Sequence, residues 1–180
     1  SSNIKGKNPF ADKRVRLAMY HALDMDAIKD KVMRGQSAPA GIITAPGING
    51  HTPERDQRLP YDPEMSKKLL AEAGYPDGFE LTLDCPNDRY INDEAICVAA
   101  IGMFAKIGVT VNLDAKTKSQ HFSEVKEGDA NGMTSDMYML GWGVPTFDSH
   151  YVYSYLFDSA GSWNKVNFRN ARVDELVAAT

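Results

Sequence analysis

Asp148, Ser149 and His150 stand next to one another and supply the three residue types of a hydrolase triad. In such a triad the members meet through the fold, because chain neighbours point their side chains apart. The GxSxG motif that exposes a nucleophilic serine on a sharp turn is absent from the sequence. We therefore interpret Asp148 or Thr146 as the cap of a helix that begins near Ser149.

Metal and phosphate chemistry have no local support in the sequence. The four histidines, at positions 21, 51, 121 and 150, show neither HxxxH nor HExxH spacing, and no CxxC pair accompanies them. The glycine patterns of phosphate-binding loops, GxGxxG and GxxxxGK, do not occur either. We expect no catalytic residue, no metal site and no cofactor.

The two cysteines, Cys85 and Cys97, could pair in an oxidising compartment. If Cys85 ends a strand and Cys97 lies several turns into the next helix, the helical rise of ~1.5 Å per residue carries them apart. A disulfide requires Cα atoms within about 7 Å of each other. We therefore expect free, partly buried thiols.

Trp142 has the features of a ligand-facing residue. It lies between Gly141 and Gly143, so the backbone around it is bare and the face of the indole is accessible. Large flat side chains suit a site that holds varied ligands by stacking and burial of area. The alternative is a tryptophan at the rim of the core that only covers its edge.

Arg89 is a second candidate, with Asn87 and Tyr90 beside it. An arginine in a loop can bind a carboxylate through two parallel hydrogen bonds. The alternative is an ordinary solvated arginine.

Composition limits the classes of partner. The net charge is −4 and no run of five basic residues appears, which argues against a nucleic-acid or anionic-membrane surface. No apolar stretch reaches membrane-spanning length. The 180 residues fit a single domain with a proper hydrophobic core.

The first third of the chain reads as three helices and one long loop. Helices are predicted to begin after Asp12, Asp24 and Asp62, the last with proline at its first position. Residues 36–61 have no periodicity and many glycines and prolines. Loops of this length are usually functional or packed as a flap, and we expect this one to fold over the surface.

A strand, helix, strand, helix, strand order follows. Strands are predicted over 79–83, 109–113 and 137–142. One helix is predicted to open after residue 92 and to end at Gly108, and a shorter one to run through Phe122 and Val125. This order is typical of an α/β layer with a mostly parallel sheet flanked by helices. Ligands gather beyond the carboxyl ends of such strands, where residues 85–92 and 143–148 form the loops.

Five blocks in order give the chain a family resemblance: NPFADKRVRLAMYHALDMDAIKDKVMRGQSAPA, LPYDPEMSKKLLAEAGYPDGFELTL, IGMFAKIGVTVNLDA, YMLGWG and NFRNARVDELV. They resemble the extracytoplasmic solute-binding proteins of peptide-type ABC transporters, family 5. The resemblance covers about Asn8 to Val177. It implies an α/β lobe of a type II-like periplasmic binding fold, with a second lobe that closes on the ligand.

The resemblance also suggests roles for residues near Trp142. The tryptophan that matches Trp142 lines the ligand cavity in peptide-binding relatives. The aspartate that receives a peptide amine has Pro145 in its place here, with Asp148 slightly displaced. An arginine that contacts a peptide carboxylate in some relatives is replaced by Met139. The family includes binders of glutathione, nickel complexes, opines and oligosaccharides, so the resemblance leaves the ligand open.

We therefore predict a non-enzymatic, periplasmic ligand-binding lobe over residues 1–180, cut from a longer protein. Its partners would be a peptide or other small solute, the second lobe and a membrane permease. The alternatives are an α/β enzyme domain that uses Asp148 and His150, and a chemoreceptor module built on the same lobe. The predicted ligand-binding residues are Asn87, Arg89, Tyr90, Trp142, Gly143, Thr146 and Asp148.

Overall fold

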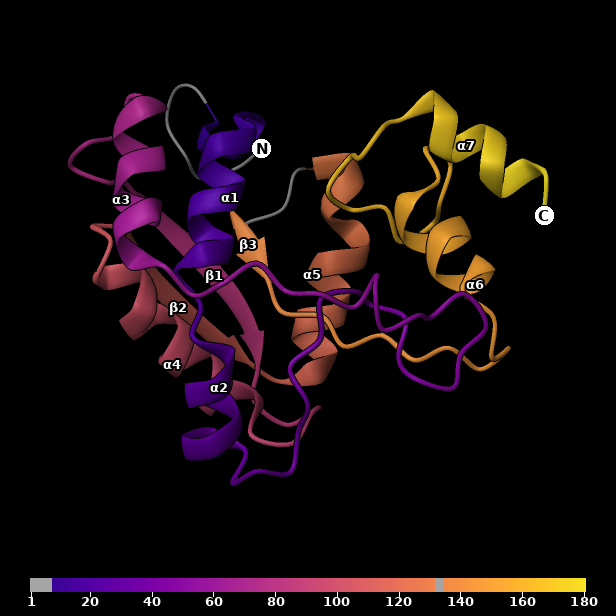
Figure 1. Ribbon diagram of the computed structural model, residues 1–180, viewed down its shortest axis with the longest axis horizontal. Coiled ribbons are helices and arrows are strands. Elements are labelled where there is room, and N and C mark those ends of the chain that lie inside the picture. The colour runs from indigo at the N-terminus through magenta and orange to yellow at the C-terminus, as the bar shows by residue number, and fades with distance from the viewer. Residues whose placement is uncertain (1–7, 132–134) are drawn as a thin grey trace. The chain divides into compact units, whose positions relative to one another are not determined.

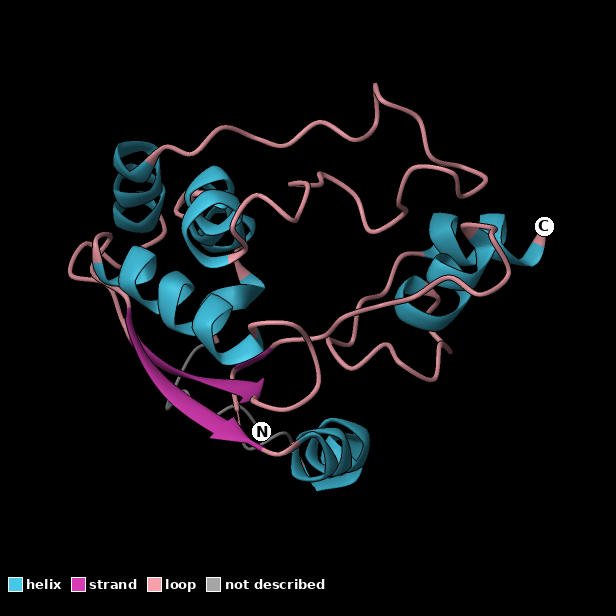
Figure 2. Ribbon diagram, turned by 90° about the horizontal axis from the view of Figure 1, so that it is seen from below, coloured by secondary structure: helices cyan, strands magenta, loops and turns pink. Residues whose placement is uncertain are grey.

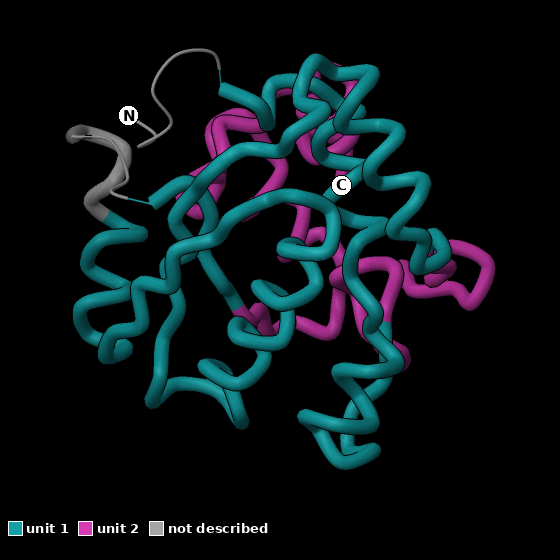
Figure 3. The backbone as a smooth tube through the Cα atoms, turned by 90° about the vertical axis from the view of Figure 1, so that its left-hand side faces the viewer, with its two compact units in different colours: residues 1–39, 59–140 teal, residues 40–58, 141–180 magenta. Residues whose placement is uncertain are grey.

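The computed structural model describes residues 8–131 and 135–180 (Figure 1). The chain divides into two compact units (Figure 3). Unit 1 contains residues 1–39 and 59–140, and unit 2 contains residues 40–58 and 141–180. That the whole chain acts as one lobe stays a prediction.

Unit 1 holds three strands and most of the helices (Figure 1). Its strands are β1 (Glu80–Pro86), β2 (Thr110–Lys116) and β3 (Met137–Tyr138). Its helices are η1 (Pro9–Ala11), α1 (Lys13–His21), α2 (Met25–Ala27), the π-helical η2 (Ile28–Val32), α3 (Pro63–Glu72), α4 (Asp93–Ala105) and α5 (Lys118–Asn131). No helix of the described ranges is long and apolar enough to cross a membrane.

The sheet is parallel in the order β2-β1-β3, which confirms the predicted α/β class. Leu83 of β1 pairs with Leu113 on one side and with Met137 on the other. The third strand is shorter than the predicted 137–142, although the backbone N–H of Met139 still donates to the carbonyl of Asp84. The glycines and the proline that follow are poor strand formers, so the ladder ends there.

The two faces of the sheet are covered differently (Figure 2). Helices α1, α3 and α4 lie over one face, where Leu81, Leu83 and Cys85 point into the hydrophobic core. Helix α5 lies on the opposite face. Because side chains alternate along a strand, Asp84 points toward α5 and away from the core.

The predicted helix starts are confirmed by capping hydrogen bonds. The carboxylate oxygens of Asp12, Asp24 and Asp62 accept from the backbone N–H groups of Arg14, Ala27 and Met65, at 2.8–2.9 Å. Ser66 and Leu70 are the buried residues of α3, Leu69 packs against the core while partly buried, and Met65 is 39% exposed.

Unit 2 contains α6 (His150–Val152), the π-helical η3 (Tyr153–Phe157) and α7 (Ala171–Ala178). The irregular segment predicted over 36–61 has no helix, and its 40–58 part belongs to this unit. Asn49 forms an isolated parallel bridge with Asp148, in which Asn49 N–H donates to Phe147 O and Ser149 N–H donates to Asn49 O. This bridge joins the two segments of unit 2.

Candidate functional site

The seven predicted binding residues fall into two groups, one in each unit. Asn87, Arg89 and Tyr90 follow β1 in unit 1. The second group follows β3 in unit 2 and consists of Trp142, Gly143, Thr146 and Asp148. The structure brings the members of each group together, and each group is described within its own unit.

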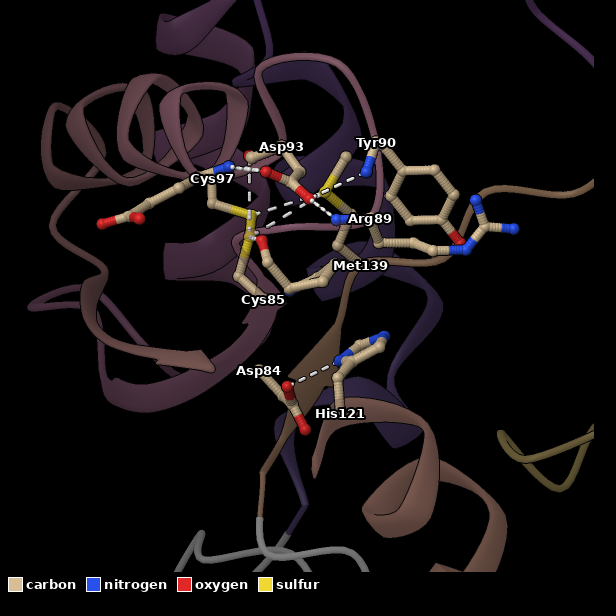
Figure 4. Close-up of a disulfide and its surroundings, with 10 residues drawn as sticks. Asp84, Cys85, Arg89, Tyr90, Asp93, Cys97, His121 and Met139 are labelled. Atoms are coloured by element: carbon tan, nitrogen blue, oxygen red, sulfur yellow. Dashed lines mark hydrogen bonds and ion pairs between the residues drawn. A yellow bond between two sulfur atoms is a disulfide. The ribbon is translucent and has the colours of Figure 1, made fainter. Parts of the chain in front are cut away.

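The loop of residues 87–92 connects β1 to α4 and is held by the carboxylate of Asp93. Oδ2 of Asp93 accepts from the backbone N–H groups of Arg89 and Tyr90, both at 2.9 Å, and Oδ1 accepts from that of Glu94 at 3.0 Å (Figure 4). Burial raises the pKa of Asp93, but these backbone hydrogen bonds outweigh it, so the pKa lies below its usual value. The backbone N–H of Asn87 donates to the carbonyl of Lys116 on β2.

Arg89 presents an exposed guanidinium from this loop. Its Cζ atom lies 4.9 Å from the ring centre of Tyr90 and 5.9 Å from that of Phe122 in α5. Figure 4 shows the guanidinium directed away from the core. Among the side chains that the structure describes, which leave out those of residues 127–134, no carboxylate lies within ion-pair distance of it. Aromatic faces therefore support the Arg89 cation, and its hydrogen-bond donors remain available for an anion.

Cys85 and Cys97 form a disulfide, and the expectation of free thiols was wrong. Their Cα atoms are 6.6 Å apart. The error lay in the number of turns assumed before Cys97: α4 begins at Asp93, so Cys97 is in its second turn rather than several turns along. The loop of residues 87–92 folds this turn back over the end of β1. Both cysteines are buried, and Met139 Sδ lies 3.6 Å from Cys97 Sγ.

A buried charge cluster lies on the other face of the sheet and was not predicted. Nδ1 of His121 in α5 is 2.7 Å from Oδ1 of Asp84 (Figure 4). Nζ of Lys116 is 3.5 Å from Oδ2 of Asp84 and contacts Asp114 at 2.7 Å and Glu124 at 2.6 Å. Burial alone would lower the pKa of Lys116, but the hydrogen bonds to Asp114 and Glu124 and the charge of Asp84 raise it above its usual value.

A cavity of ≈ 440 Å³ lies beside this cluster, lined by Asp114, Ala115, Lys116, Gln120 and Glu124. Lys116 is the only cation among the described lining residues and already contacts three carboxylates, so these residues offer no free positive charge to an anion. We regard the cluster as structural. The sequence signal that could have found it is Asp84, an acid that stands between the apolar residues Leu83 and Cys85.

Trp142 lies in a cluster of aromatic rings within unit 2. The ring centres of Tyr151, Tyr155 and Trp163 are 5.7, 6.1 and 5.9 Å from that of Trp142. The indole is partly buried, and among the described residues its Nε1–H has no hydrogen-bond partner although the atom is buried. Three rings thus fix the orientation of the indole and leave one donor unused.

Asp148 is engaged in local structure. Its Oδ2 accepts from Nδ2 of Asn49 at 2.7 Å, and its Oδ1 accepts from the backbone N–H of His150 at 2.8 Å. Asp148 thus accepts from the first residue of α6, whose N-cap residue is Ser149 without a side-chain capping hydrogen bond, so the predicted capping by Asp148 or Thr146 is not found. The hydrogen bond from Asn49 and that from the His150 backbone hold the pKa of Asp148 below its usual value.

Thr146 and Gly143 are exposed in the same segment, and the hydroxyl of Thr146 lies 3.4 Å from the carbonyl oxygen of Asp148. In the described part of the chain no group of three or more His, Cys, Asp or Glu residues could hold a metal ion.

The chain matches proteins of one family along most of its length. The family described as bacterial extracellular solute-binding proteins, family 5 Middle, matches residues 1–164. Heme-binding protein A of Haemophilus influenzae is 35% identical over 95% of this chain and 31% of its own length. The glutathione-binding protein GsiB of Salmonella typhimurium is 30% identical over 99% of this chain and 35% of its own length.

Solved structures show the same fold. A dipeptide-binding protein from a Pseudoalteromonas species, in complex with Met-Leu, has a TM-score of 0.83 and 27% identity over 96% of this chain and 34% of that protein. The chain thus spans about a third of the length of these relatives. The fold is part of a type II periplasmic binding protein. The chain belongs to the bacterial extracellular solute-binding proteins, family 5, a family of non-enzymatic, extracytoplasmic binding proteins of ABC transporters.

Proposed function

We propose that this chain is the larger part of one ligand-binding lobe of a transport protein that captures a small solute bearing a carboxylate, such as a peptide. The observation that carries the proposal is the exposed guanidinium of Arg89. It is supported by aromatic faces and has no acidic partner among the described residues. A planar guanidinium binds a carboxylate through two parallel hydrogen bonds.

The ligands named for the relatives are consistent with this solute class. Glutathione, heme and the dipeptide Met-Leu differ in size and shape. Each of these molecules carries at least one carboxylate. A free arginine at the carboxyl end of a central strand is suited to bind the carboxylate that these ligands share.

Within unit 2, Trp142 would supply an apolar surface for a ligand. Its ring is held by three aromatic neighbours, so little conformational entropy is lost when a ligand packs against it.

Asp148 would not serve as the receptor of a free amine. Its two carboxylate oxygens already accept from Asn49 and from the backbone of His150, and Pro145 stands at the place where the resemblance puts the amine-binding aspartate. We therefore propose that Asp148 and Thr146 shape the segment that carries Trp142, and that the solute is recognised through its carboxylate and its apolar part.

In the whole protein, a second lobe would complete the contacts. A ligand stabilises a closed state only by its differential affinity for that state, so contacts from both lobes would drive closure. Outside the cytoplasm, the closed complex would then deliver its solute to a membrane permease.

The test uses the full-length protein. Mass spectrometry of small molecules retained through native purification identifies the solute class, and calorimetry with glutathione and with Met-Leu measures affinity. We expect the retained solute to carry a carboxylate and Arg89→Gln to weaken its binding by roughly ten- to a hundredfold. Arg89→Lys should recover part of the loss, because it keeps the charge but not the planar fork. A retained solute without an anionic group would refute the proposal.

A further inference from the structure

Two features fix the loop that carries Arg89, and neither was predicted from the sequence. One is the Cys85–Cys97 disulfide, which links the end of β1 to the second turn of α4. The other is the carboxylate of Asp93, which is 4% exposed. Figure 4 shows the disulfide and the Asp93 carboxylate side by side under the backbone of the loop.

The disulfide fixes where the loop begins and ends. The chain leaves β1 at Pro86 and re-enters regular structure at Asp93, so the whole loop lies between the two cysteines. Sγ of Cys85 lies 3.6 Å from the carbonyl oxygen of Asp93. The cross-link thus keeps the first turn of α4 against the end of the strand.

Asp93 fixes the conformation of the loop between those ends. One carboxylate oxygen accepts from two successive backbone N–H groups, those of Arg89 and Tyr90. This pair of hydrogen bonds sets the direction in which both side chains leave the backbone. In that conformation the Arg89 guanidinium lies over the Tyr90 ring, and no hydrogen bond of its own to protein is needed to hold it there.

Further contacts anchor the loop at its edges. Oδ1 of Asp88 accepts from the backbone N–H of Lys118 at the start of α5, and Nδ2 of Asn92 donates to the carbonyl of Val32 at 3.0 Å. Asn92 itself has a left-handed backbone, with φ of 56°. Asparagine is one of the few residue types that adopt this conformation readily.

We propose that the disulfide and Asp93 act together as a brace that preorganises the Arg89–Tyr90 turn for binding an anion. Cys85, Cys97 and Asp93 are then positioning residues: they contact the loop and would not contact the solute. This inference rests on the proposed function for the use made of Arg89. Preorganisation raises affinity because the loop is ordered before the solute arrives.

The brace is tested without any solute, by hydrogen exchange with mass spectrometry on the full-length protein. In Asp93→Asn the amide has one acceptor oxygen, whereas the carboxylate of Asp93 accepts hydrogen bonds through both of its oxygens. We expect peptides covering residues 87–91 to exchange about tenfold faster or more, because hydrogen bonds to a charged acceptor are lost. Peptides from residues 80–84 should exchange as in the wild type. The double variant Cys85→Ala, Cys97→Ala should show the same local change.

Glu94→Gln is the matched control. Glu94 is the exposed neighbour of Asp93 in the same helical turn, and among the described residues its side chain has no contact with the loop, so exchange in 87–91 should not change. Unchanged exchange in both Asp93→Asn and the cysteine double variant would overturn the brace. If exchange became faster in Asp93→Asn but not in the cysteine double variant, the role assigned to the disulfide would be overturned.

Failure of the brace and failure of the proposed function give different results. Calorimetry with glutathione on the wild type and on Arg89→Gln tests the anion site. If Arg89→Gln bound glutathione as tightly as the wild type, the anion-binding role of Arg89 would fail, while the exchange data would still decide the brace.

Discussion

His121 and Asp84 form a buried pair in which Nδ1 and Oδ1 are 2.7 Å apart, with side chains 0% and 1% exposed. A buried carboxylate is costly unless it is paired and hydrogen-bonded. Here Lys116 approaches the same carboxylate from β2, so strand and helix both contribute to its compensation. The pair thereby fixes α5 against the face of the sheet opposite to the hydrophobic core.

Removal of one partner from this cluster should unfold unit 1 more easily. We expect Asp84→Ala to lower the free energy of unfolding by about 3–5 kcal/mol, because Lys116 loses a buried counter-charge and His121 loses its buried hydrogen-bond partner. Urea denaturation at neutral pH measures this loss. Asp114→Ala removes a carboxylate that is 45% exposed and contacts the same lysine, so its effect should be much smaller. If both variants lost the same free energy of unfolding, burial of the carboxylate would not explain the effect of Asp84.

Replacement of Trp142 by alanine should weaken solute binding in the full-length protein. Loss of the packing surface of an aromatic ring should reduce the binding free energy by about 1.5–3 kcal/mol. Trp142→Phe keeps a ring among Tyr151, Tyr155 and Trp163 but lacks the N–H donor, so it separates stacking from hydrogen bonding. Calorimetry with the solute identified by mass spectrometry makes the comparison. Unchanged affinity in Trp142→Ala would show that the indole only covers the core edge.

Asp93 should make stability depend on acid pH. Its folded-state pKa is below the usual value, so its contribution to stability is complete above the unfolded-state pKa of about 4 and is lost as pH falls through the folded-state pKa. We expect Asp93→Asn to be less stable than the wild type at pH 7. The difference should shrink as the pH is lowered from about 4 to 2, which urea titrations at several pH values can follow. A constant difference across that range would contradict the role of the charge.

The Cys85–Cys97 disulfide should contribute measurably to stability. Closure of a short loop typically contributes about 2–4 kcal/mol, so the double alanine variant should show a lower melting temperature. Both sulfurs are buried, and we expect reductant alone to act slowly on the native protein and quickly in urea. Thermal melts of the oxidised, reduced and double-alanine forms provide the comparison. Equal melting temperatures for all three forms would show that the bond contributes nothing.

The helices with clear capping residues were predictable because their signals are local. Asp12, Asp24 and Asp62 each accept the hydrogen bond that their position suggests. Strand ends were less predictable, because a strand stops where its partner stops. β1 continues to Pro86 because β2 continues to Lys116, whereas β3 ends at Tyr138.

Contacts between distant parts of the chain were the least predictable. The disulfide was missed because the length of the loop before α4 sets the distance between the cysteines. The pairing of His121 with Asp84 depends on which face of the sheet α5 covers, which the sequence pattern does not state. Trp142 was identified as a candidate from its flanking glycines, but its neighbour Trp163 was not.

Unit 2 is assembled from residues 40–58 and 141–180, with residues 59–140 between them in the chain. On the ribosome, residues 40–58 therefore emerge well before Asp148, the bridge partner of Asn49, has been synthesised. Domains generally complete folding as units during synthesis. Ile42 and Ile43 line a unit 2 cavity with Val152 and Phe157. In the nascent chain, these two isoleucines are therefore synthesised well before the residues that line the cavity with them. The order of translation thus leaves Ile42 and Ile43 without these partners until residues 141–180 have been made.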